Sequence, residues 1–222
     1  MGSMTNGTAL LFDLDGTLTD TDHLHVEAFR ILLADFARTI TLEHYKARIM
    51  GHPNDEIMRE MFPDESPERR IALSDHKEKL FRDQLETLTP TPGVLKVLDW
   101  ADANGVPYAV VTNAPRANAE MMLHGLGLDR RMTELVIGDE LERAKPDPLP
   151  YRTGLQRLGA SADKALAFED SLPGIRAASG AGIPTYGIRT AHPDTALLGS
   201  GAVAAIDDFT DAGLWQRLEA LL

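Results

Sequence analysis

Short apolar segments alternate with helical periodicity over much of the chain. Residues 8–12 (TALLF) form an apolar run that stops abruptly at polar residues, which is typical of a buried strand that ends in a loop. Downstream, similar strand-like segments are separated by single helical segments. The expected strands are 108–111, 135–137, 165–168, 185–188 and 202–206, and the expected helices are 94–103, 117–124, one after Pro150, 173–179 and a last one near the C-terminus. This α/β alternation predicts right-handed β-α-β units and hence a Rossmann-like parallel sheet with helices on both faces.

The segment between about residues 21 and 88 has a different pattern. Helical spacing dominates it, and strand-like runs of Val, Ile and aromatic residues are nearly missing. Three apolar helical faces are expected, the third in a helix that starts after Ser66-Pro67-Glu68. Their members are Leu24, Ala28, Ile31, Leu32 and Phe36; Ile57, Met58, Met61 and Phe62; and Ile71, Leu80, Phe81, Leu85 and Leu88. An all-α block is therefore expected directly after the first strand.

These patterns predict a two-part domain organisation. We expect a discontinuous α/β core of residues 8–18 and 90–222, and an inserted helical cap domain of residues 19–89. The Pro- and Thr-rich stretch at residues 89–93 would be the hinge by which the chain returns to the core. Residues 1–4 (MGSM) resemble the remnant of an expression tag before a native start at Met4, and we leave them out of the fold.

Composition and charge narrow the range of functions. The 222 residues include 22 Lys and Arg against 34 Asp and Glu, a net charge of −12 at pH 7. Such a field would repel nucleic acids and anionic membranes, so neither is expected as a partner. The absence of cysteine excludes disulfides, thiolate metal sites and cysteine nucleophiles. No apolar run approaches the roughly 18 residues of a membrane span and no secretory signal follows the start, so a cytoplasmic location is expected.

Polar residues follow the expected strands at their carboxyl ends, where open parallel sheets bind ligands. The first strand is followed by Asp13-Leu14-Asp15-Gly16-Thr17, the second by Thr112-Asn113, the third by Lys145 and the fourth by Glu169-Asp170. Among these residues are four acids, the hydroxyl of Thr112 with nearby backbone amides, and one lysine. The sequence therefore predicts that these side chains gather at one site.

This set of groups fits phosphoryl transfer assisted by a divalent cation. Carboxylate oxygens favour Mg²⁺, while a hydroxyl, loop amides and an ammonium group can hold the oxygens of a phosphoryl group. Asp13 and Asp15 lie two residues apart and would share one face of an extended strand. One can attack phosphorus while the other handles the proton of the leaving group, provided that their pKa values differ. We expect metal binding to keep Asp13 ionised and Asp15 to carry the proton.

The ordered motifs resemble those of the haloacid dehalogenase superfamily of phosphohydrolases. The residues that carry the resemblance are Asp13-Leu14-Asp15-Gly16-Thr17, Thr112, Lys145 and Glu169-Asp170, in this order. The helical insertion resembles the small α-helical type of cap in that superfamily, and the resemblance covers almost the whole chain. It implies that Asp13 is the nucleophile that becomes an aspartyl phosphate. It also implies that Asp15 is the acid/base and binds Mg²⁺ through its backbone carbonyl.

The resemblance assigns roles to the other motif residues as well. Thr112 and the backbone amide of Asn113 would bind the phosphate. Lys145 would stabilise the nucleophile and the charge of the phosphoryl group. Glu169 and Asp170 would hold the Mg²⁺ ion together with the two aspartates of the first motif.

The start of the insertion indicates a subgroup. Residues 19–25 resemble the start of the cap in sugar-phosphate phosphatases and β-phosphoglucomutase, with His25 at the position of a substrate-binding histidine near the acid/base. A mutase has to hold a second phosphate with basic residues around a cap glycine. Residues 50–54 (MGHPN) contain no Lys or Arg, although Arg48 lies only three residues before Gly51. We therefore expect hydrolysis of a small phosphomonoester, foremost a sugar phosphate, with a mutase of the β-phosphoglucomutase type and a phosphoglycolate phosphatase as alternatives.

Other classes of function are less expected. Dehalogenases of the superfamily lack an acid at the place of Asp15, and phosphonatases use a cap lysine in a setting that none of Lys46, Lys77 and Lys79 matches. A non-enzymatic phosphoaspartate switch similar to a receiver domain would have another motif order and no helical insertion of this length. A scaffold protein without activity would not need the intact motif set. Because small-capped relatives are often monomers, a monomer is expected.

Overall fold

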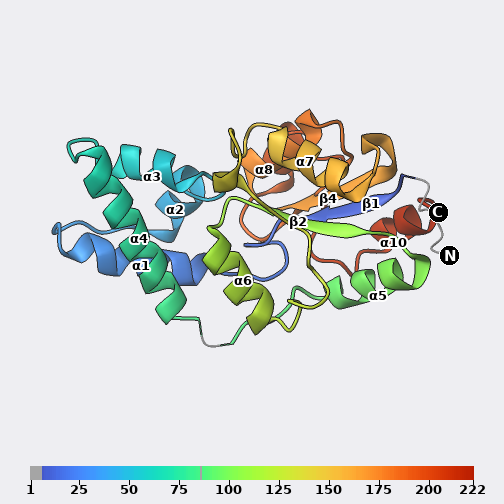
Figure 1. Ribbon diagram of the computed structural model, residues 1–222, viewed down its shortest axis with the longest axis horizontal. Helices are drawn as coiled ribbons and strands as arrows, with labels where there is room; N and C mark the ends of the chain where they lie inside the picture. The colour runs from blue at the N-terminus through green and yellow to red at the C-terminus, as the bar shows by residue number, and fades with distance from the viewer. Residues whose placement is uncertain (1–6, 86) are drawn as a thin grey trace.

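A computed structural model describes residues 7–85 and 87–222 of the chain, so the tag remnant expected at residues 1–4 lies outside the described residues. Within this part, six parallel strands form one sheet in the order β3-β2-β1-β4-β5-β6 (Figure 1). The strands are β1 (Ala9–Phe12), β2 (Tyr108–Thr112), β3 (Leu135–Ile137), β4 (Ala165–Glu169), β5 (Thr185–Ile188) and β6 (Ala204–Ile206). The predicted Rossmann-like α/β fold is confirmed, and the last strand begins two residues later than expected.

The strand order fixes where a ligand can bind. The chain builds the sheet outward from β1 to β2 and β3, and then returns to the other side of β1 with β4. Leu10 accordingly pairs with Tyr108 of β2 and with Leu166 of β4. Connections on the two sides of β1 leave in opposite directions, which opens a crevice at the carboxyl ends of β1 and β4.

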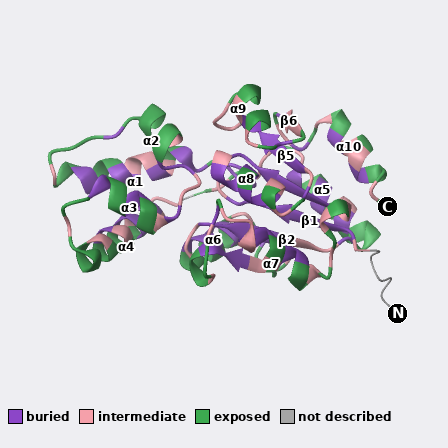
Figure 2. Ribbon diagram, turned by 90° about the horizontal axis from the view of Figure 1, so that it is seen from above, coloured by how far each residue is buried: buried purple, intermediate pink, exposed green. Residues whose placement is uncertain are grey.

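Helices cover both faces of the sheet because successive side chains of each strand point to opposite faces. Leu10 and Phe12 pack with α5 (Val94–Asn104), α6 (Arg116–Gly125) and α10 (Ala212–Glu219). Ala9 and Leu11 pack with α7 (Leu149–Leu158) and α8 (Leu172–Gly180) on the other face. All four side chains are fully buried, and Figure 2 shows the strands as buried elements between the helices. The remaining core elements are α9 (Asp194–Gly199) and the short 3₁₀ helices η1 (Gly138–Glu140) and η2 (Ala162–Lys164).

Four helices between β1 and α5 form a helical block with an apolar core of its own, at one end of the molecule (Figure 1). They are α1 (Asp22–Ala34), α2 (Leu42–Arg48), α3 (Asn54–Met61) and α4 (Pro67–Asp83). The helical character of this segment was predicted, but the assignment of two residues to buried apolar faces was wrong. Ile31 is 42% exposed and Ile71 63% exposed, because both lie on the sides of their helices that face solvent. Leu85 and Leu88 follow the end of α4, so they extend no helical face.

The two segments that join the helical block to the sheet lie side by side. The backbone N–H of Thr91 donates to the carbonyl of Leu18 at 2.8 Å, and its hydroxyl donates to the carbonyl of Thr17 at 2.7 Å. Gly93 adopts a φ of 82°, and a side chain there would collide with the backbone of Phe209. The return segment is thus fixed against the first crossing. Within the described residues, no helix combines the length and apolar composition that a membrane crossing requires.

Candidate active site

A pocket lies between the carboxyl ends of the strands and the helical block. Its wall on the sheet side includes Asp13, Asp15, Thr112, Asn113, Lys145 and Asp170, and its wall on the side of the helical block includes Asp22, His25, Tyr45, Met50, Gly51, Asn54, Lys77 and Glu78. Every candidate residue named from the sequence therefore lines this pocket except Glu169, which lies directly behind Lys145 and is fully buried. Sequence motifs separated by more than 150 residues meet here because parallel strands end at one edge of the sheet.

Asp13 and Lys145 form the floor of the pocket. The backbone N–H of Asp13, directly after β1, donates to the carbonyl of Phe168 in the adjacent β4. Lys145 Nζ donates to Asp13 Oδ1 at 2.7 Å and to Glu169 Oε1 at 2.5 Å, and the lysine is 1% exposed. Tyr151 of α7, which the sequence analysis missed, donates its hydroxyl to the same Glu169 oxygen at 2.6 Å. These partners hold the lysine ammonium in one position against the candidate nucleophile.

A cluster of carboxylates next to Asp13 has the composition of a divalent-cation site. Oxygens of Asp13, Glu169 and Asp170 lie within 4.8 Å of one another, and all three residues are buried. Both carboxylate oxygens of Asp170 lack a hydrogen-bond partner, which is costly for a buried charge unless a cation compensates it. Hard oxygen donors of this kind fit Mg²⁺. Side chains at Gly16 and Gly174 would overlap the carboxyl groups of Asp170 and Glu169, so glycine at both positions leaves room for this cluster.

The protonation of the cluster follows from burial and mutual repulsion. Burial, together with the negative charge of Glu169, raises the pKa of Asp13 to about 8, although Lys145 opposes the shift. Burial and the neighbouring charges of Asp13 and Glu169 also raise the pKa of Asp170. For Lys145, burial alone would lower the pKa, but the adjacent carboxylates outweigh it and the pKa is raised. The lysine is therefore a permanent cation at the floor of the pocket.

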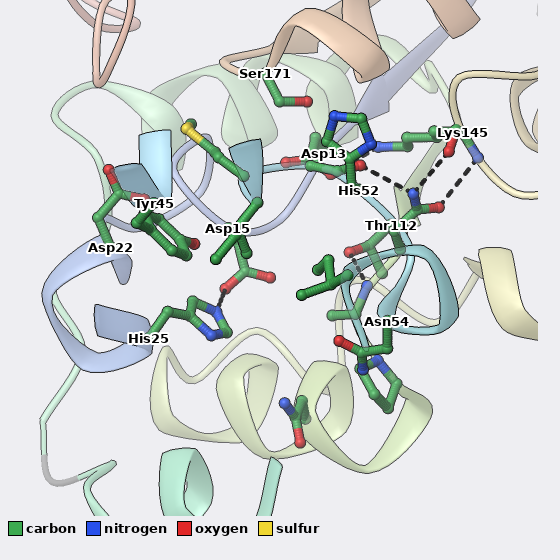
Figure 3. A pocket seen from close by; sticks show the side chains of 18 of the residues that line it. Asp13, Asp15, Asp22, His25, Tyr45, His52, Asn54, Thr112, Lys145 and Ser171 are labelled. Atoms are coloured by element: carbon green, nitrogen blue, oxygen red, sulfur yellow. Dashed lines mark hydrogen bonds and ion pairs between the residues drawn. The ribbon is translucent and has the colours of Figure 1, made fainter. Parts of the chain in front are cut away.

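Asp15 faces the helical block. The chain turns back after Asp15 at Gly16, whose φ is 73°, and the next segment brings Thr21 and His25 alongside. The Thr21 hydroxyl donates to Asp15 Oδ1 at 2.6 Å, and His25 Nε2 lies 3.1 Å from the same oxygen (Figure 3). Burial alone would raise the pKa of Asp15, but the hydrogen bonds from His25 and Thr21 and the positive charge of Lys77 outweigh it, so the pKa is lowered.

The two aspartates thus have different environments, although they lie only two residues apart. Burial raises the pKa of Asp13 and hydrogen bonds lower that of Asp15, and the protonation states expected with a cation at Asp13 stay a prediction. The sequence-based expectation assumed a bound cation at Asp13 and did not include the hydrogen bonds that Asp15 accepts from the helical block. Both are physical differences that motif spacing does not contain.

Lys77 and Glu78 of α4 complete the pocket; from the sequence, Lys77 was considered only as a phosphonatase lysine and Glu78 was not named. Lys77 Nζ lies 2.9 Å from His25 Nδ1 and 3.0 Å from Glu78 Oε1. Because an ammonium group only donates hydrogen bonds, His25 Nδ1 has to be the acceptor, and the ring proton is then on Nε2, from which it is donated to Asp15. The spacing of Lys77 indicates that it is buried, because it lies four residues from the buried Leu73 and four from the buried Phe81, on the apolar side of α4.

Thr112 and Asn113 hold the segments around the pocket. Thr112 Oγ1 accepts from the backbone N–H of Ala114 at 3.0 Å. The Asn113 side chain accepts from the N–H of Lys145 and donates to its carbonyl, each at 3.1 Å. It also lies 3.0 Å from the carbonyl of Gly51, to which its amide donates. The side chain of Asn113 therefore fixes the lysine segment and the helical block, which leaves its backbone amide as the group predicted to face the phosphate.

Taken together, a doubly wound α/β core that carries a buried aspartate–lysine pair and a carboxylate cluster, covered by a helical insertion, defines a capped hydrolase. Residues 10–188 match a family model that is described as "Haloacid dehalogenase-like hydrolase". The chain belongs to this family, as its motifs had indicated.

Relatives of known description agree with this membership. The chain is 33% identical to a "Phosphorylated carbohydrates phosphatase" of Thermotoga maritima over 204 residues, which cover 89% of this chain and 93% of the relative. It is 30% identical to a "Phosphoglycolate phosphatase" of Rhodospirillum rubrum over 226 residues, covering 93% and 90%. Among solved structures, CbbY of Rhodobacter sphaeroides in complex with phosphate superposes with a TM-score of 0.82 at 28% identity, covering 95% of this chain and 98% of CbbY.

Proposed function

We propose that this protein is a Mg²⁺-dependent phosphatase that hydrolyses a phosphorylated sugar through an aspartyl phosphate on Asp13. The observation that carries the proposal is the juxtaposition of Asp13 with the Lys145 ammonium at 2.7 Å and with the unpartnered carboxylate of Asp170. A nucleophilic carboxylate, a fixed cation and an acceptor set for a metal are the three requirements of this chemistry. Residues 8–18 and 90–222 would form the catalytic core and residues 19–89 the cap.

Each residue would have a distinct part in the reaction. The Asp13 carboxylate attacks phosphorus, and Lys145 offsets the negative charge of the phosphoryl oxygens. Asp15, in its protonated form, gives a proton to the leaving alcohol, and the resulting carboxylate then takes one from the water that hydrolyses the aspartyl phosphate. His25, through its Nε2 proton, holds the Asp15 carboxyl in place at 3.1 Å.

The carboxylate cluster fits a Mg²⁺ ion. Asp13, Asp170 and Glu169 would hold it, with the backbone carbonyl of Asp15 as the further ligand that the family resemblance implies. When bound, Mg²⁺ supplies positive charge that keeps Asp13 ionised and offsets the charge of the phosphoryl group. Asp170 is the most available metal ligand, because its oxygens have no hydrogen-bond partner. Both oxygens of Glu169, in contrast, already accept hydrogen bonds from Lys145, Tyr151 and Ser171.

The helical block would exclude bulk water from the reaction. Its contacts with the core support this role: the Asn113 amide donates to Gly51, and the buried Asn118 amide donates to Glu78 at 2.6 Å. Hydrolysis is favoured over phosphate transfer between two sites of a sugar because residues 50–54 supply no Lys or Arg to the pocket. A phosphorylated carbohydrate is the leading substrate and phosphoglycolate the alternative, as the names of the two relatives suggest. A cytoplasmic monomer stays a prediction.

The test is phosphate release from a panel of small phosphomonoesters, with Mg²⁺ and with EDTA. We expect metal-dependent turnover of one or a few sugar phosphates. Asp13→Asn should abolish it without changing the far-UV circular dichroism spectrum or cooperative unfolding, whereas Asp35→Asn, at an exposed position outside the pocket, should behave as the native protein. Substantial turnover by Asp13→Asn would refute the covalent mechanism. Absence of phosphate release from every ester of the panel by the folded native protein would refute the phosphatase proposal.

A further inference from the structure

The wall of the pocket that faces the leaving group comes from the helical block, and its charges are already balanced. Among the described residues, the lysines that line the pocket are Lys77 and Lys145, and no arginine lines it. Lys145 is held by Asp13 and Glu169, and Lys77 is paired with Glu78 at 3.0 Å. Arg48, the nearest arginine in the sequence to Gly51, is paired with Glu60 at the surface. A second negative group on a substrate would find no cation without a carboxylate partner in this wall.

Glu78 is the charged centre of this wall. It is 4% exposed, and its carboxylate accepts hydrogen bonds from Lys77, from Asn54 at 2.8 Å and from Asn118 at 2.6 Å. Burial alone would raise its pKa, but Lys77 and the other partners outweigh it and lower the pKa, so the group is ionised at neutral pH. A fixed carboxylate at this place repels an incoming carboxylate or phosphate.

Asp22 adds a hydrogen-bond acceptor to the same side of the pocket. It is 7% exposed, its Oδ2 has no hydrogen-bond donor, and its nearest cation, Lys46, is 3.6 Å away. The Tyr45 hydroxyl points toward Asp15, beside the same opening (Figure 3). Burial and the neighbouring carboxylates raise the pKa of Tyr45 well above its ordinary value, so it stays a neutral donor and acceptor. A buried acceptor that lacks a hydrogen-bond donor is satisfied by a ligand that brings one, which a hydroxyl group does.

We propose that the leaving-group side of the pocket selects an uncharged, hydroxyl-bearing group, so that the substrates are monophosphates of sugars or polyols, and that Glu78 excludes substrates with a second anionic group. The inference rests on the proposed function and makes it narrower. Hydroxyl groups can donate to Asp22 and exchange hydrogen bonds with Tyr45. A second phosphate or the carboxylate of phosphoglycolate would be buried without a partner and next to Glu78, which is strongly unfavourable.

The experiment compares kcat/KM for three probes: fructose 1-phosphate, fructose 1,6-bisphosphate and 2-phosphoglycolate. The native protein should favour the monophosphate at least about tenfold over each of the others. Glu78→Gln should narrow that preference, and Asn54→Lys should narrow it about tenfold, because a lysine there can still donate to Glu78 and adds a positive charge to the wall. Asn104→Lys adds the same charge at an exposed site on the core and should leave the ratio unchanged.

The outcomes separate this inference from the function on which it rests. Equal or better hydrolysis of the bisphosphate or of phosphoglycolate by the native protein would overturn the selectivity and leave the phosphatase in place. An unchanged ratio in both Glu78→Gln and Asn54→Lys would overturn the assignment to Glu78, and the second variant decides the matter if the first does not fold. Absence of phosphate release from all three probes by the folded protein would overturn the phosphatase proposal itself.

Discussion

Gly51 is a position where the helical block lies against the core, which makes it a direct probe of closure over the site. Its φ of 76° lies in the left-handed region. A Cβ atom there would lie 2.5 Å from both Cβ and Oγ of Ser171, at the end of β4, whereas ordinary contacts are 3.4–4 Å. The Gly51 carbonyl also accepts from the Asn113 amide at 3.0 Å. The substitution Gly51→Ala therefore opposes the closed arrangement at one defined contact.

The size of the effect can be worked out from these distances. Restoring a normal contact requires the two segments to separate by about 1 Å, and a misplacement of about 1 Å in an active site costs about 100-fold in rate. We expect kcat/KM for a sugar phosphate to fall by about 10- to 100-fold. The left-handed backbone adds about 1–2 kcal/mol of strain, which lowers Tm by about 2–8 °C in a protein of this size.

The matched control is Gly105→Ala. Gly105 also has a positive φ, 65°, at the end of α5, but a Cβ there would have no neighbour within 4 Å. The control should lose a similar amount of stability and keep its activity. The reasoning would be refuted if both variants lost activity equally, since backbone strain alone would then explain the result. It would also be refuted if Gly51→Ala kept activity within twofold of the native protein.

Two further predictions concern protons. Because His25 lowers the pKa of Asp15, His25→Ala should raise that pKa and move the acidic limb of the kcat–pH profile to higher pH. The control is His124→Ala, at an exposed position, which should leave the limb in place. An acidic limb that His25→Ala does not move would contradict the role of His25. In EDTA, Asp13 has a pKa of about 8 in the native state and 3.8 as the reference value, so the native state retains a proton that the unfolded chain has lost and stability declines as pH rises from about 5 to 8. Relative to Asp13→Asn, Tm should fall by about 3–5 °C per pH unit, and Mg²⁺ should raise Tm more at pH 8 than at pH 5.5. Equal changes of Tm with pH in the two proteins would argue against the buried proton.

The fold could be predicted from the sequence because its signals are local. Each strand is a short apolar run that ends at polar residues, and the runs at residues 135–137 and 185–188 coincide with β3 and β5. The errors occurred in the helical block, where Ile31 and Ile71 are apolar but exposed. Periodicity says which residues share a face of a helix, but not which part of that face another helix covers.

The site was predictable only in part, for a related reason. Groups at strand ends converge because of sheet topology, so Asp13, Lys145 and Asp170 could be brought together without coordinates. Tyr151 and Glu78 could not be placed in the site from the sequence, because they come from helices and not from strand ends. Their place in the site depends on how α7 and α4 dock, which follows from side-chain packing over the whole interface rather than from a local pattern.

The partners of Asp13 and Asp15 come from different parts of the chain, although the two residues are only two apart. Lys145 and Glu169, the charged neighbours of Asp13, belong to the core, so these contacts do not depend on the position of the helical block. Asp15 takes its hydrogen bonds from Thr21 and from His25, the latter oriented by Lys77 of α4. Displacement of the block would remove the His25 contact that lowers the pKa of Asp15, while the hydrogen bond from Lys145 to Asp13 would stay in place. In the proposed mechanism, the hydrogen bonds of the acid/base therefore depend on the helical block, and those of the nucleophile depend on the core.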